Sequence, residues 1–300
     1  MTLTLALILD AIFGEPNWLW SRLRHPAVLM GGLIGWCDRR FNHGPRRKAK
    51  GIATVIALSV IAWTLGALLS QLGMLVEVVI AAILLAQRSL VDHVQAVATG
   101  LRASVAEGKR AVAMIVGRDT QDMEGSDVAR AAIESAAENF SDGVIAPAFW
   151  FVIGGLPGLI FYKIINTADS MIGYKTPRHR AFGWAAARLD DVLNWIPARL
   201  TAYALLALSG HWDKRHVMAA EAGKHRSPNA GWPEAAMAYA LNIALSGPRS
   251  YHGVRTEFPY VHESGKKALV PQDIEAATSW LWRVWGVFTI LTFVGYIFFG

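Results

Sequence analysis

Residues 51–70 form a run of twenty amino acids without a single charged side chain. An α-helix of about 20 apolar residues is long enough to cross the hydrocarbon core of a bilayer. The composition agrees with a membrane location, because 53% of the chain is hydrophobic and only 17% is charged. The sequence therefore predicts an integral membrane protein.

Further apolar segments predict that the chain is polytopic. Residues 72–86 follow the first run so closely that the two would form a helical hairpin, and residues 284–300 are again uncharged. Between them, residues 196–209 and 232–247 are shorter apolar segments. We expect an all-α, polytopic membrane protein with about five spans plus broken or re-entrant helices, organised as one domain over residues 1–300.

The apolar segment 144–165 is the least regular of these. Its middle reads Gly154-Gly155-Leu156-Pro157-Gly158, and neither paired glycines nor a proline suits the interior of a straight helix. This pattern predicts two half-length helices around a break. Two paths remain open: a re-entrant hairpin that returns to its starting side, or a full crossing.

Charge and cysteine content narrow the function classes. The net charge is +6, and its cations gather beside apolar runs, as in residues 39–50, which indicates a cytoplasmic orientation signal. No nucleic-acid-binding motif accompanies them, so nucleic acid is not an expected partner. Cys37 is the only cysteine, which excludes an intramolecular disulfide. Phosphate-binding P-loop, zinc-protease and serine-hydrolase motifs are absent. The N-terminus has no cationic leader, so we expect no cleaved signal peptide.

Two polar segments, 88–143 and 163–199, are the candidate site. In the first, Arg130, Glu134 and Glu138 are spaced by four and share one helix face, which Asp142 extends by a turn. A solvated salt-bridge stripe is the alternative. Because the helix leads directly into an apolar segment, we favour an oxygen-rich Mg²⁺ site.

The second segment repeats a pattern of carboxylates with amides. Asn166 lies three residues before Asp169, and Asp190-Asp191 precede Asn194 by about one turn. Each set could instead be a helix cap or a polar pair in the core. Four cations lie close in sequence: Lys163, Lys175, Arg188 and Arg199. This combination indicates a divided metal–phosphate site, in which carboxylates hold the ion and cations neutralise phosphoryl oxygens.

These motif blocks resemble the adenosylcobinamide-phosphate synthase family of cobalamin biosynthesis. The blocks are Asp10 with Gly14-Glu15-Pro16 and His25-Pro26, residues 117–120, 130–147, 162–175, 187–191, 196–201 and 227–235. They cover nearly the whole chain in order. The resemblance implies an ATP-dependent amide ligation of adenosylcobyric acid with an aminopropanol phosphate, namely (R)-1-amino-2-propanol O-2-phosphate, to give adenosylcobinamide phosphate. Mg²⁺ and ATP are the implied cofactors.

The motifs and the resemblance together give a set of residue roles. The expected catalytic residues are Glu134, Glu138, Asp169, Asp190 and Asp191. The expected metal ligands are Glu138, Asp142, Asp169 and Asp190. Phosphate, cofactor or substrate binding is expected of Arg118, Asp119, Asn139, Lys163, Asn166, Lys175, Arg188, Asn194, Arg199 and Asn229.

Location follows from the implied reaction. We expect a multi-pass protein of the cell inner membrane. Because ATP is cytoplasmic, both polar segments should face the cytoplasm. This orientation requires either that residues 144–165 turn back or that the second segment lines a cavity open to the cytoplasm. Association with other membrane enzymes of the pathway is a further expectation. A non-enzymatic membrane sensor and a corrinoid transporter remain as alternatives, since charged groups in broken helices also mark transport paths.

Overall fold

The computed structural model describes residues 1–251 and 254–299, which divide into two compact units. Unit 1 comprises residues 1–88, residues 142–195 and the chain from residue 292 onward. Unit 2 comprises residues 89–141 and 196–291. The candidate site residues are therefore shared between the units. The prediction of one domain over 1–300 stays a prediction.

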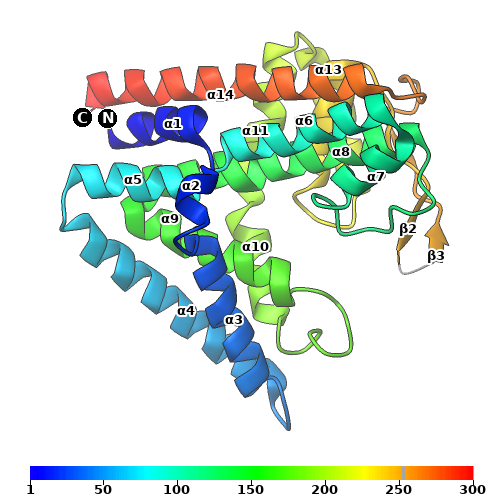
Figure 1. Cartoon of the computed structure of the whole chain (residues 1–300). Coiled ribbons are helices and arrows are strands. Elements are labelled where there is room, and N and C mark those ends of the chain that lie inside the picture. Colours follow the sequence, from blue (N-terminus) through cyan, green and yellow to red (C-terminus); the bar gives the residue numbers. More distant parts are fainter. Residues whose placement is uncertain (252–253, 300) are drawn as a thin grey trace. The chain divides into compact units, whose positions relative to one another are not determined.

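Over its described residues, all the regular secondary structure of unit 1 is helical. Its helices are α1 (Thr2–Phe13), α2 (Asn17–Trp20), α3 (Pro26–Phe41), α4 (Arg47–Ser70), α5 (Met74–Leu84), α9 (Ala146–Ile172) and α10 (Trp184–Leu193). Helix α4 confirms the predicted first span, and α5 follows it after a short turn in which Gly73 has a φ of +94° (Figure 1). Helix α9 packs against α3, α4, α5 and α10, so it forms the centre of the unit.

Helix α9 is broken where the sequence predicts. Gly154 and Gly155 leave helical geometry, and Gly155 has a φ of +60°, which glycine adopts without strain. The chain then turns back, because the hydroxyl of Tyr162 donates to the carbonyl oxygen of Asp142 at 2.8 Å. A straight helix would separate residues twenty apart by about 30 Å. The chain therefore doubles back on itself after the break, as the re-entrant alternative requires.

Close packing holds this hairpin against α4. A Cβ atom on Gly66 of α4 would lie 2.4 Å from the Cα of Pro157, so only glycine allows this approach. The rings of Trp150 and Phe161, one on each side of the break, are 6.5 Å apart. The two halves of α9 thus pack on each other as well as on α4.

Two polar residues of the opening block have structural partners. A carboxylate oxygen of Asp10 accepts from the backbone N–H of Gln87 at 2.8 Å, at the start of the next helix. The ring of His25 accepts from the backbone N–H of Ala27, and its other nitrogen lies 3.2 Å from the carbonyl oxygen of Ile83. Asp10 and His25 therefore cap helix ends within unit 1.

Unit 2 contains most of the remaining helices. They are α6 (Gln87–Ala103), α7 (Val105–Val112), α8 (Gly125–Phe140), α11 (Trp195–Leu208), the 3₁₀ turn η2 (Trp212–Lys214), α12 (Arg215–Ala222), α13 (Gly231–Leu241) and α14 (Pro271–Phe299). Helices α6 and α11 begin with residues of unit 1, and α14 ends with them. The amide of Gln95 on α6 donates to the hydroxyl of Thr278 on α14 at 2.9 Å. The π-helical turn η1 (Ser141–Ile145) joins α8 to α9.

Four short strands follow α13. Strand β1 (Leu245–Ser246) pairs antiparallel with β4 (Tyr260–Val261), and β2 (Arg249–Tyr251) pairs with β3 (Val254–Thr256). The sequence predicts a polar, irregular segment over 248–279 with a helix at its end, and a closing span that begins near Trp280. Helix α14 begins at Pro271 and runs on through the predicted span without a break, and the carboxylate of Asp273 accepts from the backbone N–H of Val270 at its start.

Length and composition support the predicted class. Four helical segments of the described chain are long and apolar enough to cross a membrane: Arg47–Ser70, Met74–Ala103, Gly125–Ile172 and Pro271–Phe298. Two shorter apolar helices, Thr2–Phe13 and Trp195–Leu208, accompany them. The prediction of an all-α membrane protein with long apolar helices and a broken helix is confirmed.

Candidate functional site

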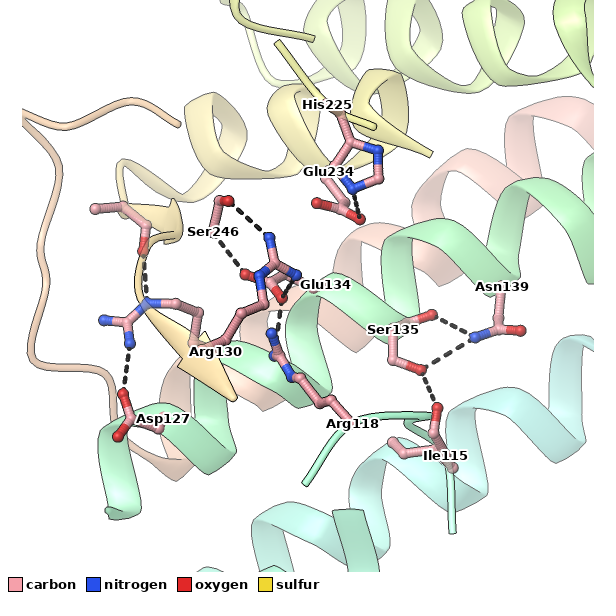
Figure 2. Close-up of polar contacts among 12 residues, drawn as sticks. Ile115, Arg118, Asp127, Arg130, Glu134, Ser135, Asn139, His225, Glu234 and Ser246 are labelled. Carbon is pink, nitrogen blue, oxygen red and sulfur yellow. Dashed lines mark hydrogen bonds and ion pairs between the residues drawn. The ribbon is translucent and has the colours of Figure 1, made fainter. Parts of the chain in front are cut away.

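Glu134 is the centre of a buried charge cluster in unit 2. Its carboxylate lies 2.8 Å from the guanidinium of Arg118 (Figure 2). It also lies 3.4 Å from the guanidinium of Arg249. It also accepts from the backbone N–H of Ser246 at 2.6 Å. Glu134 is only 4% exposed, so water does not compete strongly for its carboxylate. The carboxylate therefore fixes the positions of Arg118 and Arg249 beside β1. The expected catalytic role of Glu134 stays a prediction.

Arg130 belongs to the same helix face and is also buried. It donates to Asp127 at 3.0 Å, to the carbonyl oxygen of Ala244 at 3.2 Å and to that of Lys267 at 2.6 Å. These bonds tie α8 to β1 and to the segment before α14. The alternative of a solvated stripe is wrong for Arg130 and Glu134, because both are less than one-tenth exposed.

Asn139 and Ser135 fix the segment that positions Arg118. The amide of Asn139 donates to the carbonyl and hydroxyl oxygens of Ser135, and that hydroxyl donates to the carbonyl oxygen of Ile115 at 2.7 Å (Figure 2). The 115–118 segment is thus held against α8. Asn139 is exposed and Glu138 is half-buried, so both reach the surface of the unit.

A cavity of about 500 Å³ opens beside this cluster. Guanidinium groups and carboxylates both line it: Arg118, Arg130, Arg249, Asp119, Asp122 and Asp127. Arginine recognises phosphate through paired hydrogen bonds, so three of them around one cavity suit a phosphorylated ligand. Arg118 and Asp119, which are expected to bind phosphate, cofactor or substrate, both line this cavity. Their binding role stays a prediction. Arg249 is an addition that the sequence does not single out.

Glu234 is a further buried carboxylate that the sequence reasoning missed. It is 3% exposed, and one of its oxygens lies 3.8 Å from the Nε2 atom of His225 (Figure 2). Burial raises the pKa of Glu234 well above its usual value, and the nearby charges of Glu134 and Glu138 raise it further. The available signal was a lone acidic residue within the apolar segment 232–247.

Asp190 is the centre of a second polar cluster, in unit 1. The amide of Asn166 donates to one of its oxygens at 3.2 Å, and the amide of Asn194 donates to the other at 3.0 Å. The hydroxyl of Tyr162 also lies 2.9 Å from the amide oxygen of Asn194. The two sequence patterns, one on α9 and one on α10, therefore meet in space.

Asp169 adds a second carboxylate to this cluster. Burial, together with the negative charge of Asp169, raises the pKa of Asp190 to about 7. Gly173 leaves room for that carboxylate, since a Cβ atom there would lie 1.9 Å from an oxygen of Asp169. Among the residues that the structure describes, no cation pairs with Asp169 or Asp190, so a bound cation would stabilise the two carboxylates.

The expected cations divide between the units. In unit 1, Arg188 lies 3.4 Å from Asp191. Lys175 acts electrostatically on Asp191, and Lys163 interacts with Asp142, Glu15 and Asp10. In unit 2, Arg199 stacks over the ring of Trp232 at 4.4 Å and lies 3.5 Å from the amide oxygen of Asn229. Each unit thus presents its own set of anion-binding groups.

The donor set of unit 1 suits Mg²⁺ shared with a ligand. Within the described residues, no group of three or more His, Cys, Asp or Glu side chains is arranged to hold a metal ion. Mg²⁺ is commonly held by one or two carboxylates together with substrate phosphates. Asp169 and Asp190 are hard oxygen donors whose mutual repulsion a divalent cation relieves, so they fit that mode.

The family model described as CobD/Cbib protein matches residues 3–281. The chain belongs to the CobD/Cbib family. The match includes both polar clusters, and the resemblance stated above is therefore confirmed at the level of the family. No solved structure matches the chain.

Relatives of this CobD/Cbib protein align over nearly its full length. A protein of Rhizobium meliloti (strain 1021) named cobalamin biosynthesis protein CobD is 47% identical, over 96% of this chain and 94% of its own. One of the same name from Brucella suis biovar 1 is 48% identical, over 96% and 94%. A third, from Halalkalibacterium halodurans, is 39% identical, over 98% and 93%.

Proposed function

We propose that the protein is an adenosylcobinamide-phosphate synthase. It would join a propionate carboxylate of adenosylcobyric acid to the amine of (R)-1-amino-2-propanol O-2-phosphate, with ATP as the driving co-substrate. The observation that supports this best is the pairing of Asp169 with Asp190, whose oxygens are oriented by Asn166 and Asn194. The names of the relatives place them in cobalamin biosynthesis, which agrees with this reaction.

The reaction needs the carboxylate to be activated, because a carboxylate and an amine do not condense unaided in water. A carboxylate oxygen attacks the γ-phosphorus of ATP and ADP leaves, which gives an acyl phosphate. The amine nitrogen then attacks the acyl carbon, phosphate leaves and a base takes the amine proton. Both steps concentrate negative charge on phosphoryl oxygens, so fixed cations accelerate them.

The residues of unit 1 fit the activating step. Asp169 and Asp190 would hold Mg²⁺, which when bound neutralises phosphate charge. Lys163, Lys175 and Arg188 would bind phosphoryl oxygens or the substrate carboxylate. Asp191 lies beside Arg188 and would serve as the proton acceptor.

Unit 2 contributes further groups to the proposal. Arg118 and Asp119 line the first cavity and would bind phosphate. Arg199, Asn139 and Asn229 would orient substrate. Glu134 and Glu138 of unit 2, and Asp142 at the start of the second segment of unit 1, remain proposed as catalytic or metal-binding carboxylates. We place the protein in the cell inner membrane with these groups facing the cytoplasm, where ATP is available.

A product assay tests the proposal directly. Purified protein in liposomes is incubated with adenosylcobyric acid, Mg·ATP and (R)-1-amino-2-propanol O-2-phosphate, and the corrinoid is analysed by mass. We expect the amide product together with one ADP for each amide formed. Unchanged corrinoid from well-folded protein would refute the ligase proposal.

The same vesicles separate the two alternatives. The re-entrant α9 is a feature shared with transporters, in which broken helices bind substrates near the membrane midplane. Accumulation of unmodified, labelled adenosylcobyric acid inside vesicles would indicate a transporter. Binding of corrinoid without ATP consumption or accumulation would indicate a sensor.

A further inference from the structure

A second cavity in unit 2, of about 420 Å³, lies above Glu234. It is formed by the end of α12, the following loop, the start of α13 and the strands β1 and β4. We call it the Glu234 cavity.

The wall of the Glu234 cavity contains an incompletely paired acceptor. One oxygen of Glu234 lies 3.8 Å from His225, beyond hydrogen-bond distance, and the other is buried without a hydrogen-bond partner among the described residues. Burial lowers the pKa of His225, which disfavours the charged form of the ring that would balance a carboxylate. A buried carboxylate in this state is stabilised by a ligand that donates hydrogen bonds to it.

Cations line the same cavity. Lys224, Arg226 and Arg249 are all among its lining residues. The guanidinium groups of Arg226 and Arg249 lie over the ring of Phe258, at 5.0 Å and 5.1 Å from its centre. The hydroxyl of Ser246 accepts from Arg249 at 2.7 Å, which further fixes that side chain. Two arginines held on one aromatic ring form a pre-organised anion site.

The Glu234 side of the cavity suits a positively charged group, and the side lined by Lys224, Arg226 and Arg249 suits a negatively charged group. One small molecule that carries both charges would complement the whole cavity. We propose that the Glu234 cavity binds a small phosphorylated amine, with its ammonium group at Glu234 and its phosphate at Lys224, Arg226 and Arg249. This inference rests on the proposed function and deepens it, because the amino-alcohol phosphate is the substrate of that class. Glu234 is then the residue that distinguishes an amine from other phosphate esters.

Binding without turnover tests the assignment. The full-length protein in detergent, without ATP or corrinoid, is titrated calorimetrically with (R)-1-amino-2-propanol O-2-phosphate and with isopropyl phosphate, which lacks the amine. Loss of one charge-assisted hydrogen bond costs about 1.5–3 kcal/mol, which is about tenfold or more in affinity. We expect Glu234→Gln to weaken binding of the amine by that factor and to leave binding of isopropyl phosphate unchanged.

Arg226→Gln tests the other half of the cavity. We expect it to weaken both ligands, whereas Lys214→Gln, which changes an exposed lysine paired with Asp213, should change neither. Retained isopropyl phosphate binding by Glu234→Gln shows that this variant is folded. Equal affinities of Glu234→Gln and the unaltered protein for the amine would overturn the assignment.

The binding result is independent of the ligase result. Selective amine-phosphate binding that depends on Glu234, in a protein that makes no amide, would support the cavity and refute the ligase. Amide formation with a KM for the amine that Glu234→Gln leaves unchanged would support the ligase and overturn the cavity assignment.

Discussion

The guanidinium of Arg118 lies 2.8 Å from the carboxylate of Glu134, and the two side chains are 7% and 5% exposed. This ion pair is shielded from water and connects the 115–118 segment to α8. A buried pair of this kind contributes little net stability relative to apolar residues, but removing one partner leaves a buried charge uncompensated. Replacing either Arg118 or Glu134 alone should therefore lower the stability of the folded protein.

Glu134→Gln should destabilise the fold strongly. It leaves Arg118 and Arg249 without their shared carboxylate, and breaking a buried pair typically costs about 3–5 kcal/mol. Thermal unfolding of the protein in detergent measures the effect as a lower Tm. Glu107→Gln is the matched control, because Glu107 pairs with Arg110 at the surface. Equal Tm changes for the two variants would contradict the prediction.

Gly173→Ala should abolish ligation without removing any polar group. Its methyl carbon would lie 1.9 Å from an oxygen of Asp169, so that carboxylate must move from its position in the site. Displacement of a reacting group by about 1 Å can cost on the order of 100-fold in rate. The product assay measures the loss. Gly32→Ala is the control, since a Cβ atom there meets nothing within 4 Å.

Asp169→Asn and Asp190→Asn should each eliminate product formation while the protein remains folded in the membrane. Each change removes one negative charge from the proposed Mg²⁺ site, which holds two. Asp213→Asn controls for surface charge, because Asp213 is 66% exposed. Product mass and membrane content are measured together. Full activity in a folded Asp169→Asn enzyme would remove this residue from the site.

Glu234 should make the fold less stable as the pH rises. Its pKa in the folded protein is raised above the usual 4.5, so the folded state binds the proton more tightly than the unfolded state does. The associated stability is fully present below pH 4.5 and is lost as the pH rises through the folded-state pKa. Glu234→Gln has no carboxyl group to ionise at this position and does not lose this stability. The Tm of the variant minus the Tm of the unaltered protein should therefore increase as the pH rises above 4.5. A constant Tm difference from pH 4 to 8 would disprove the effect.

Cysteine labelling tests the orientation of the second polar segment. Thr176 is exposed and follows the end of α9, so a Thr176→Cys variant is accessible to reagents. The natural thiol at Cys37 is removed by Cys37→Ala. We expect labelling of inverted vesicles, whose cytoplasmic face is outward, by a reagent that does not cross membranes. Labelling from the periplasmic side alone would refute the cytoplasmic orientation.

Much of the candidate site could be predicted because its residues follow local patterns. The sequence spacing identified two polar groups, Asn166 with Asp169 and Asp190 with Asn194. In the structure, the amides of Asn166 and Asn194 both donate to the carboxylate of Asp190. Glu234 and Arg249 could not be found in this way. Glu234 stands alone in an apolar segment, and Arg249 approaches Glu134 only through the folding of the strands after α13.

Sequence alone determined the protein class and the position of the break in α9, because both depend on local properties: the length of apolar runs and the backbone freedom of glycine and proline. Only the tertiary structure decided the path beyond the break. The bond from Tyr162 to Asp142 and the approach of Gly66 to Pro157 join residues far apart in sequence. A local pattern permits either path, whereas the packing between distant segments stabilises just one.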